Sequence, residues 1–387
     1  MVRLLKSFKT EINPTEEQKH KINKTIGTCR YIYNFYIAHN KELHDKGEKF
    51  MSGKAFSVWL NNEYIPNNPD KIWIREVYSK AVKHSMEDAC TAFTRFFKHQ
   101  SGFPRFKKKS RSDVKMYFVK NNPRDCCCER HRMNIPTLGW VRFKEKGYVP
   151  TTKDGWIIRS GTVSIKAGRY YVSALVDVPE HKFTGNFTEG IGIDLGIKDF
   201  AIVSNGRTYK NINKSAKIKK LEKQLRRGQR CLSRKYENFK KGESTQRNIQ
   251  KQKLKIQKIH QRINNIRTDY INKTIAEIVK TKPSYITIED LNVRGMMKNR
   301  HLSKAVASQK FYEFKAKLKI KCDDNGIKLR IVDRFYPSSK LCHCCGSIKT
   351  DLKLSDRIYK CDCGYVEDRD FNASLNLRDA TTYEIAL

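Results

Sequence analysis

Four cysteines near the C-terminus have the residue type and the spacing of zinc ligands. Cys342 and Cys345 form a CxxC pair, Cys361 and Cys363 form a shorter CxC pair, and a glycine follows each pair. Two thiolate pairs separated by a short strand–loop–strand suit tetrahedral Zn²⁺. Each pair caps half of the ion, and the glycine lets backbone amides turn toward the sulfurs. The sequence therefore predicts a zinc ribbon.

Alternatives to this ligand set stay open. Cys344 is a spare thiol inside the first pair, the second pair is short, and four buried free thiols are the competing interpretation. The run from Cys126 to Cys128, with His131 nearby, suggests a second metal site. That interpretation is weaker, because the run has no partner pair and adjacent cysteines cannot easily share one tetrahedral ion.

Carboxylates at the ends of apolar segments form the second chemical pattern. Asp194 interrupts the apolar run 190–197, Glu289 and Asp290 end the strand-like segment 284–289, and Asp368 and Asp370 begin a helix. A lone carboxylate inside a buried strand is costly unless it binds a cation. Mg²⁺ requires oxygen ligands, so these acids are candidates for a magnesium centre.

The order of the elements around these acids is that of an RNase H-like nuclease domain. A strand hairpin is followed by long helices, a strand, a helix, the strand 328–333 and a last helix. In such a domain, carboxylates from the first strand, a later parallel strand and the last helix hold two Mg²⁺ ions that serve phosphodiester hydrolysis.

The charge of the chain indicates a polyanionic partner. Its 79 Lys and Arg residues exceed 40 Asp and Glu, which gives a formal charge of +39. Nucleic acid fits better than a membrane, because no segment has the roughly 18 consecutive apolar residues of a spanning helix. The N-terminal residues lack the apolar region of a signal peptide, and the twelve cysteines then indicate a reducing compartment. We expect a cytoplasmic, nucleoid-associated protein.

The N-terminal half combines helices and strands. A basic strand (2–10) precedes Pro14, and Thr15 and Gln18 predict a capping box at the start of an amphipathic helix. A second helix is expected over about 77–98, and the aromatic stripe of these helices is interpreted as core packing. Short alternating segments then predict strands of a small barrel or sandwich. They are 114–118, 140–143, 155–158, 162–166 and 170–176.

Two basic segments are candidates for nucleic-acid contact. The first, 102–110, places phenylalanines among cations, which suits a phosphate backbone and a stacked base; a solvated loop is the alternative. Its candidate contacts are Arg105, Lys107, Lys108 and Lys109. The second, 214–267, has isoleucine and leucine at three- and four-residue spacing and predicts a helical hairpin with a cationic exterior.

Several motifs together resemble TnpB, the insertion-sequence-encoded family of RNA-guided nucleases that is related to the type V CRISPR effectors. The resemblance spans essentially the full length. It is carried by CRYIYNF (29–35), GFPRFK (102–107), LGWVRF (138–143), GIDLGIKDFA (192–201), IED with LNV (288–293), and the segment from the first cysteine pair through CGYVEDRDFNASLNL.

The resemblance implies an α/β multidomain fold. A wedge-type β-barrel (1–12 and 101–185) would be interrupted by a helical recognition domain (13–100). A RuvC-like, RNase H-like nuclease domain (186–340 and 366–387) would contain the basic helical hairpin (214–280), with the zinc ribbon inserted at 341–365.

The resemblance also implies the activity and the site. The family's catalytic triad falls on Asp194, Glu289 and Asp370, and its Asp-x-Asn-Ala pattern selects Asp370 over Asp368. The expected cofactors are structural Zn²⁺, catalytic Mg²⁺ for which Mn²⁺ can substitute, and a guide RNA. The expected substrate is double-stranded DNA that matches the guide beside a short flanking motif.

Departures from the family pattern lie outside the triad. Asn272 stands where histidine is frequent, Phe311 stands where tryptophan is frequent, and the second cysteine pair is CxC. Rival functions are a guide-dependent DNA-binding repressor without cleavage, a transposase or accessory transposition protein, and an RNA-binding structural protein. The order Asp, Glu, Asp argues against the transposase, and three acids on apolar strands argue against the structural protein.

Overall fold

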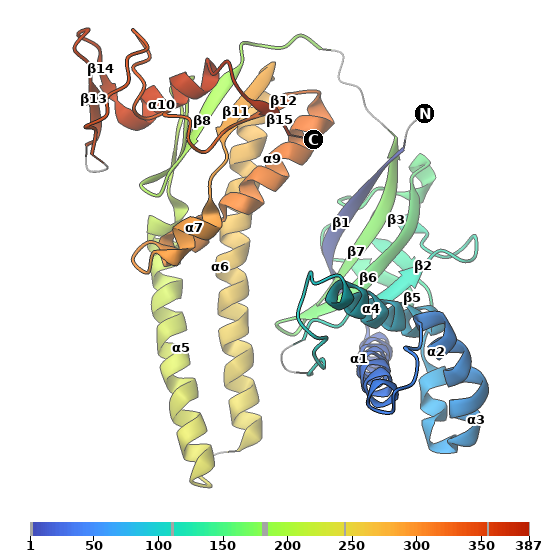
Figure 1. Cartoon of the computed structure of the whole chain (residues 1–387). Helices are drawn as coiled ribbons and strands as arrows, with labels where there is room; N and C mark the ends of the chain where they lie inside the picture. The colour runs from blue at the N-terminus through green and yellow to red at the C-terminus, as the bar shows by residue number, and fades with distance from the viewer. Residues whose placement is uncertain (1–2, 110–111, 180–184, 244, 354–355, 387) are drawn as a thin grey trace. The chain divides into compact units, whose positions relative to one another are not determined.

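A computed structural model describes residues 3–109, 112–179, 185–243, 245–353 and 356–386 of the chain (Figure 1). The chain divides into two compact units, 1–180 and 181–387. In the described residues, no helix has the length and apolarity needed to cross a membrane.

The first unit combines a helical segment with an antiparallel sheet. Its helices are α1 (Glu16–Asp45), α2 (Gly53–Trp59), α3 (Ile65–Asn67) and α4 (Ser79–Phe97). Its strands are β1 (Arg3–Asn13), β2 (Met116–Val119), β3 (Cys128–Glu129), β4 (Arg132–Ile135), β5 (Gly139–Phe143), β6 (Ile157–Lys166) and β7 (Arg169–Pro179).

The predicted capping box starts α1. The backbone N–H of Gln18 donates to Thr15 Oγ1 at 3.3 Å, and the backbone N–H of Thr15 donates to Gln18 Oε1 at 3.0 Å. The Gln18 amide also donates to the carbonyls of Leu138 and Trp140, both at 3.0 Å. One side chain therefore both starts the helix and joins it to the sheet.

The N-terminal strand lies in the middle of the seven-stranded sheet, whose order is β2-β6-β7-β1-β5-β4-β3. β1 pairs antiparallel with β7 from Arg3↔Pro179 to Ile12↔Tyr170, and with β5 at Ile12↔Phe143. Phe118 of β2 and Met133 of β4, from opposite ends of the sheet, are buried in the same core cluster. The sheet therefore curves around one core.

The predicted strands of this unit overlap β2, β5, β6 and β7, whereas β3 and β4 were not predicted, and two of the predicted segments belong to one strand. The segments 155–158 and 162–166 form the single strand β6, whose pairing with β7 shifts register between Ile158 and Ser160. The Arg159 side chain there binds Asp177, with 2.7 Å between Nε and Oδ2. The aromatic stripe of α1 and α4 is confirmed as core packing, since Tyr33, Tyr36 and Phe93 are buried together.

The second unit is built around a mixed sheet. Its strands are β8 (Ile191–Leu195), β9 (Asp199–Val203), β10 (Thr208–Lys210), β11 (Tyr285–Glu289), β12 (Lys328–Val332), β13 (Ile358–Lys360), β14 (Val366–Asp368) and β15 (Glu384–Ile385). Its helices are α5 (Ala216–Lys240), α6 (Gln246–Lys280), α7 (Val293–Lys298), α8 (Ser303–Gln309), α9 (Phe311–Asn325) and α10 (Arg369–Arg378).

The central sheet has the order β10-β9-β8-β11-β12-β15. β8, β11 and β12 are parallel to one another, and the outer pairings are antiparallel. Apolar side chains of α6 and α9 cover one face; they include Ile271, Ile275, Phe314 and Leu318. A parallel centre brings the carboxyl ends of β8, β11 and β12 to one edge, where functional residues gather in such folds.

The predicted helical hairpin is formed by α5 and α6, which lie side by side (Figure 1). Ile218, Leu221, Ile249 and Ile256 are buried, and the Gln252 amide donates to the Gly228 carbonyl at 2.9 Å. Most lysines and arginines of the hairpin are exposed. The first helix of the hairpin continues to Lys240, and the second begins at Gln246.

Candidate metal centres

A glycine in β8 lets α10 lie directly on the central sheet. Ile191 and Ile193 point into the core formed with α6 and α9. Side chains alternate along a strand, so Gly192 faces the opposite side. A Cβ at Gly192 would lie 2.1 Å from the Ser374 carbonyl oxygen and 2.3 Å from the Arg378 backbone nitrogen. Glycine at this position therefore permits the contact between α10 and β8.

Asp194 and Glu289 stand at the same end of neighbouring parallel strands. β8 pairs Ile193 with Ile288 of β11, and each acid is the next residue on its strand. By the same alternation, both acids point away from the isoleucine core and toward the face that α10 covers. Asp370 lies in the first turn of α10.

Burial and neighbouring acids act together on Asp194. Loss of water raises the pKa of Asp194 well above its usual value, and the negative charges of Glu289 and Asp370 raise it further. Burial also raises the pKa of Glu289. Acids that repel one another away from water favour the binding of a multivalent cation. The charge of the cation offsets both the loss of hydration and the repulsion between the carboxylates.

Glu289 and its neighbour Asp290 have different partners. The buried Ser338 hydroxyl donates to Glu289 Oε1, which opposes the rise in the Glu289 pKa. Asp290 binds Lys315 and Arg334, each with 2.9 Å between nitrogen and oxygen, and these partners lower the pKa of Asp290. Asp290 is therefore neutralised by protein cations.

The two acids at the start of α10 also differ. Asp368 Oδ1 accepts the backbone N–H groups of Asp370 at 2.9 Å and Phe371 at 3.1 Å, so Asp368 is the N-cap of the helix. The Asp370 carboxylate contacts guanidinium groups instead, at 3.0 Å from Arg369 Nη2 and 3.7 Å from Arg357 Nη1. A metal ion at Asp370 would compete with these arginines.

Sequence reasoning did not assign roles to Ser338, Arg357 or Arg369. No spacing rule connects Ser338 with Glu289, which is 49 residues away in the chain. For the contact between Arg369 and Asp370, the sequence signal was the opposite charge of two neighbouring residues.

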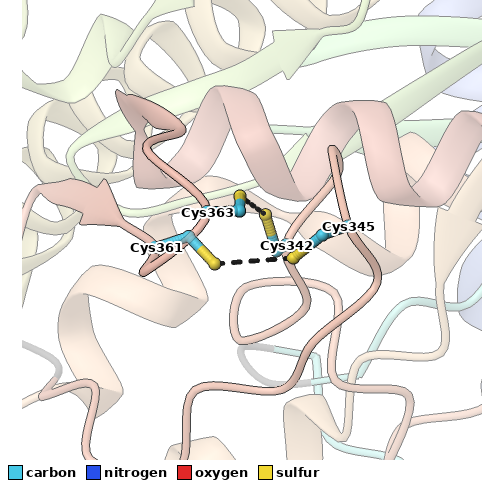
Figure 2. A group of neighbouring side chains, drawn as sticks. All are labelled: Cys342, Cys345, Cys361 and Cys363. Carbon is cyan, nitrogen blue, oxygen red and sulfur yellow. Dashed lines mark hydrogen bonds between the residues drawn. The ribbon is translucent and has the colours of Figure 1, made fainter.

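The four predicted zinc ligands form one cluster (Figure 2). The Sγ atoms of Cys342 and Cys363 are 3.7 Å apart, and those of Cys345 and Cys361 are 3.6 Å apart. Tetrahedral Zn²⁺ with bonds of about 2.3 Å places sulfurs about 3.8 Å from one another. The cluster therefore has the dimensions of a zinc site. Cys344, the spare thiol, is exposed and is not a member of it.

The turns after each cysteine pair suit thiolate ligands. Gly346 and Gly364 have φ of 74° and 89°, a conformation that glycine adopts readily. The Cys363 backbone N–H, followed by the Ser347 hydroxyl, lowers the pKa of the Cys361 thiol to about 6, so this ligand is a thiolate at neutral pH.

The cysteine run in the first unit has a packing role. Cys126 and Cys128 are buried in the core of the seven-stranded sheet, and burial raises the pKa of both thiols to about 12. The Cys127 thiol donates to the Pro123 carbonyl at 3.4 Å. The buried side chains of Cys126 and Cys128 therefore pack in the core as small apolar residues do.

The carboxylates are spread more widely than the cysteines. In the part of the chain that the structure describes, the cysteine cluster is the one group of three or more such ligand atoms within 4.8 Å of one another. Two metal ions about 4 Å apart need a wider set of ligands than one ion does. Asp194, Glu289 and Asp370 supply hard oxygen donors of the kind that Mg²⁺ prefers, and their mutual repulsion fits a divalent cation.

The four cations of the loop 102–109 do not share one environment. Arg105, Lys108 and Lys109 are exposed, whereas Lys107 is half-buried. Lys107 Nζ lies 3.6 Å from the centre of the Tyr33 ring and 4.0 Å from Asp88 Oδ2. Burial lowers the pKa of Lys107. Lys107 therefore fastens the loop to α1 and α4, and three cations of this set point to solvent.

Comparison with known proteins adds family relationships. The family model OrfB_IS605, described as "Probable transposase", matches residues 173–300, and the model "Cas12f1-like, TNB domain" matches 311–377. A helix-turn-helix model of the OrfB_IS605 group matches 1–49. In the described part of that range the structure has β1 and the long helix α1.

Full-length relatives cover nearly the whole chain. "Putative RNA-guided DNA endonuclease" of Streptomyces pristinaespiralis is 30% identical over 97% of this chain and 89% of its own length. "Putative RNA-guided DNA endonuclease InsQ" of Escherichia coli K12 is 29% identical over 97% of this chain and 92% of its own. The fold is shared with a chain of a Cas12f1–sgRNA–target DNA complex, with a TM-score of 0.60, 13% identity, and coverage of 99% and 100%.

Proposed function

The chain belongs to the TnpB family, and from this premise we propose that it is an RNA-guided DNA endonuclease associated with a transposon. Its substrate is double-stranded DNA that pairs with a bound guide RNA beside a short flanking motif. The relatives that span nearly the whole chain carry the name of this activity.

The observation that supports the proposal most is the placement of three acids around the α10 face of the central sheet, near enough for the charges of Glu289 and Asp370 to act on Asp194. Asp194 and Glu289 lie at the ends of neighbouring parallel strands, and Asp370 lies in the first turn of α10. This helix can contact β8 because Gly192 has no side chain. The raised pKa of Asp194, caused by burial and by the other two acids, is typical of a place built for cations. Mg²⁺ held there would activate water and stabilise the leaving oxygen of a phosphodiester.

We assign the finer architecture on the same premise. The second unit, with its mixed sheet, is a RuvC-like nuclease domain of the RNase H-like class, and the zinc ribbon is inserted between β12 and α10. The seven-stranded sheet of the first unit is the wedge-type barrel, and α1 to α4 are the recognition domain. The antiparallel sheet around one core supports the barrel assignment.

The basic surfaces hold the nucleic acids. Exposed cations on α5 and α6 and on the loop 102–109 suit phosphate contacts, which bind without reading sequence. Sequence is read by base pairing with the guide, so the protein needs to recognise only the flanking motif. The first unit is the reader of that motif in this proposal.

The test is to change the guide. Protein co-expressed with its RNA is purified, and the RNA is sequenced. Replacing the guide segment is expected to redirect cleavage to the matching DNA beside the unchanged motif, in the presence of Mg²⁺ or Mn²⁺. Alanine at Asp194, Glu289 or Asp370 is expected to abolish cleavage and to leave RNA and DNA binding largely intact, because each change removes one metal ligand.

Two outcomes would overturn the proposal. Equal cleavage of the same sites by RNA-free protein would make the chain an ordinary nuclease. Guide-dependent DNA binding without cleavage by wild-type protein would support the repressor instead. Full cleavage by the Glu289→Ala variant would refute the triad.

A further inference from the structure

A short segment between β12 and the first cysteine pair joins the zinc ribbon to the candidate magnesium centre. Within it, Ser338 is 2% exposed, and its hydroxyl donates to Oε1 of Glu289. The hydrogen bond occupies one carboxylate oxygen. The other oxygen, Oε2, can then serve a metal ion from a fixed position.

Two asparagines of α10 hold this segment. The Asn376 amide donates to the carbonyls of Ser338 at 2.8 Å and Leu341 at 2.7 Å. The Asn372 amide donates to the Leu341 carbonyl at 2.8 Å and accepts the backbone N–H of His343 at 3.2 Å. These bonds lie on both sides of Cys342 in the chain.

The two asparagines are placed to hold the backbone of this segment in a fixed position. They are one helical turn apart, on the same face of α10, and are 0% and 3% exposed. Buried amides that satisfy backbone carbonyls are costly to remove, because the carbonyls would stay unpaired. The Tyr336 hydroxyl donates to the Asn376 carbonyl at 3.1 Å and adds a further tie. The helix that carries Asp370 thus also holds the segment that orients Glu289.

We propose that Ser338 is a positioning residue for Glu289, and that the zinc-bound Cys342 turn, through Asn372 and Asn376, keeps Ser338 in place. Zinc in the ribbon thereby sets the affinity of the carboxylate centre for Mg²⁺. The inference deepens the proposed function, since it concerns the metal of the same site. Loss of residues that orient a metal ligand typically weakens metal affinity by about 10- to 100-fold.

The first test compares Ser338→Ala with Ser338→Thr, which keeps the hydroxyl, and with Ser339→Ala at the neighbouring serine. We expect Ser338→Ala to raise the Mg²⁺ concentration at half-maximal cleavage about 10-fold or more, with much of the rate recovered at excess Mg²⁺. Guide RNA and DNA binding should be unchanged. Ser338→Thr should stay closer to wild type than Ser338→Ala does. An unchanged half-maximal concentration, or an equal shift in Ser339→Ala, would overturn the role of Ser338.

The second test concerns the connection to zinc. Asn376→Leu keeps the size of the side chain and all four cysteines, so zinc content should stay at one per chain and report a folded ribbon. We expect a shift in Mg²⁺ dependence like that of Ser338→Ala. The double variant should shift no further than the larger single one, because both changes break one connection. Additive shifts would show that the asparagine acts independently of Ser338.

A binding measurement separates this inference from the proposed function. Mn²⁺ binding, followed by electron paramagnetic resonance, does not require cleavage, and Asp194→Ala supplies the blank. Weaker Mn²⁺ binding by Ser338→Ala than by wild type would support the inference even if the wild-type protein failed to cut DNA. Equal Mn²⁺ binding by the two proteins would overturn it even if wild-type cleavage were robust.

Discussion

At the scale of single residues, protonation of Asp194 would govern whether the proposed magnesium centre takes a metal ion. Burial and the charges of Glu289 and Asp370 raise its pKa, so folded protein binds this proton more tightly than the unfolded chain does. The ionised carboxylate therefore lowers the stability of metal-free protein above that raised pKa. The penalty begins to shrink as the pH falls to the raised pKa, and it is gone only below the ordinary pKa of an unfolded aspartate.

Removing the charge should therefore stabilise the metal-free protein. Asp194→Asn is expected to unfold about 2 °C or more above wild type in EDTA at neutral pH, the shift for about 1 kcal/mol in a unit of this size. It should also lose cleavage. Thermal unfolding as a function of pH is the measurement, and the difference should shrink as the solution becomes acidic. Mg²⁺ should stabilise wild type and leave Asp194→Asn unchanged.

Asp368→Asn is the matched control for this prediction. Asparagine caps a helix about as well as aspartate, so the cap of α10 should survive and the stability should stay near that of wild type. A metal-free Asp194→Asn protein less stable than wild type would contradict the electrostatic account.

At the scale of elements, the contact between α10 and β8 brings the third acid to the first two. It depends on the missing side chain of Gly192, over which the α10 backbone lies. In our proposal zinc affects the same region, because the ribbon lies in the chain between β12 and α10 and zinc coordination would supply its folding free energy.

Gly192→Ala should move α10 and disable the centre. A Cβ 2.1 Å from the Ser374 carbonyl oxygen cannot be accommodated without a backbone shift, and overpacking of this kind costs typically 1–3 kcal/mol. We expect a lower unfolding temperature and loss of cleavage. Gly102→Ala, whose Cβ would meet no atom within 4 Å, is the control for stability. Wild-type cleavage by Gly192→Ala would refute the packing argument.

The ribbon should bind one Zn²⁺ per chain. Metal analysis of purified protein is the measurement, and the double change Cys342→Ser with Cys361→Ser should remove the metal and expose the ribbon to proteolysis, because coordination supplies its folding free energy. Cys344→Ser, at the spare exposed thiol, should retain the full zinc content. Zinc retained by the double variant would contradict the assigned ligand set.

At the scale of the whole molecule, the charge of +39 favours a polyanionic partner. Cations that contact phosphates release counterions, so binding should weaken steeply with salt. Individual cations contribute unequally, because some are already engaged by the protein, as Lys107 is by Tyr33 and Asp88.

Lys108 and Lys109 should therefore differ from Lys107 in their effect on nucleic-acid binding. The change Lys108→Glu with Lys109→Glu is expected to weaken binding and to flatten its salt dependence, since exposed cations contact phosphates. Lys107→Met should chiefly lower thermal stability, because it removes the cation from the Tyr33 ring. Affinity measured across a salt series decides between them. An unchanged salt slope in the double variant would exclude this loop from the binding surface.

Features that depend on local spacing could be predicted from the amino-acid sequence. The two cysteine pairs with their glycines predict the ribbon, and the four sulfurs meet in the structure. The capping box at Thr15 and Gln18 and the strand 328–332 are also where the pattern predicts them. Such signals are readable because a few neighbouring residues determine the geometry.

Features that depend on residues distant in the chain follow from the folded structure. In the structure Asp368 caps α10, and Lys107 packs against the Tyr33 ring. Sequence alone does not separate Asp368 from Asp370, or Lys107 from Lys108. The folded structure also joins Ser338 to Glu289 and inserts β1 between β5 and β7. These outcomes follow from packing between separate elements, in which burial and steric fit select among side chains that local spacing cannot distinguish.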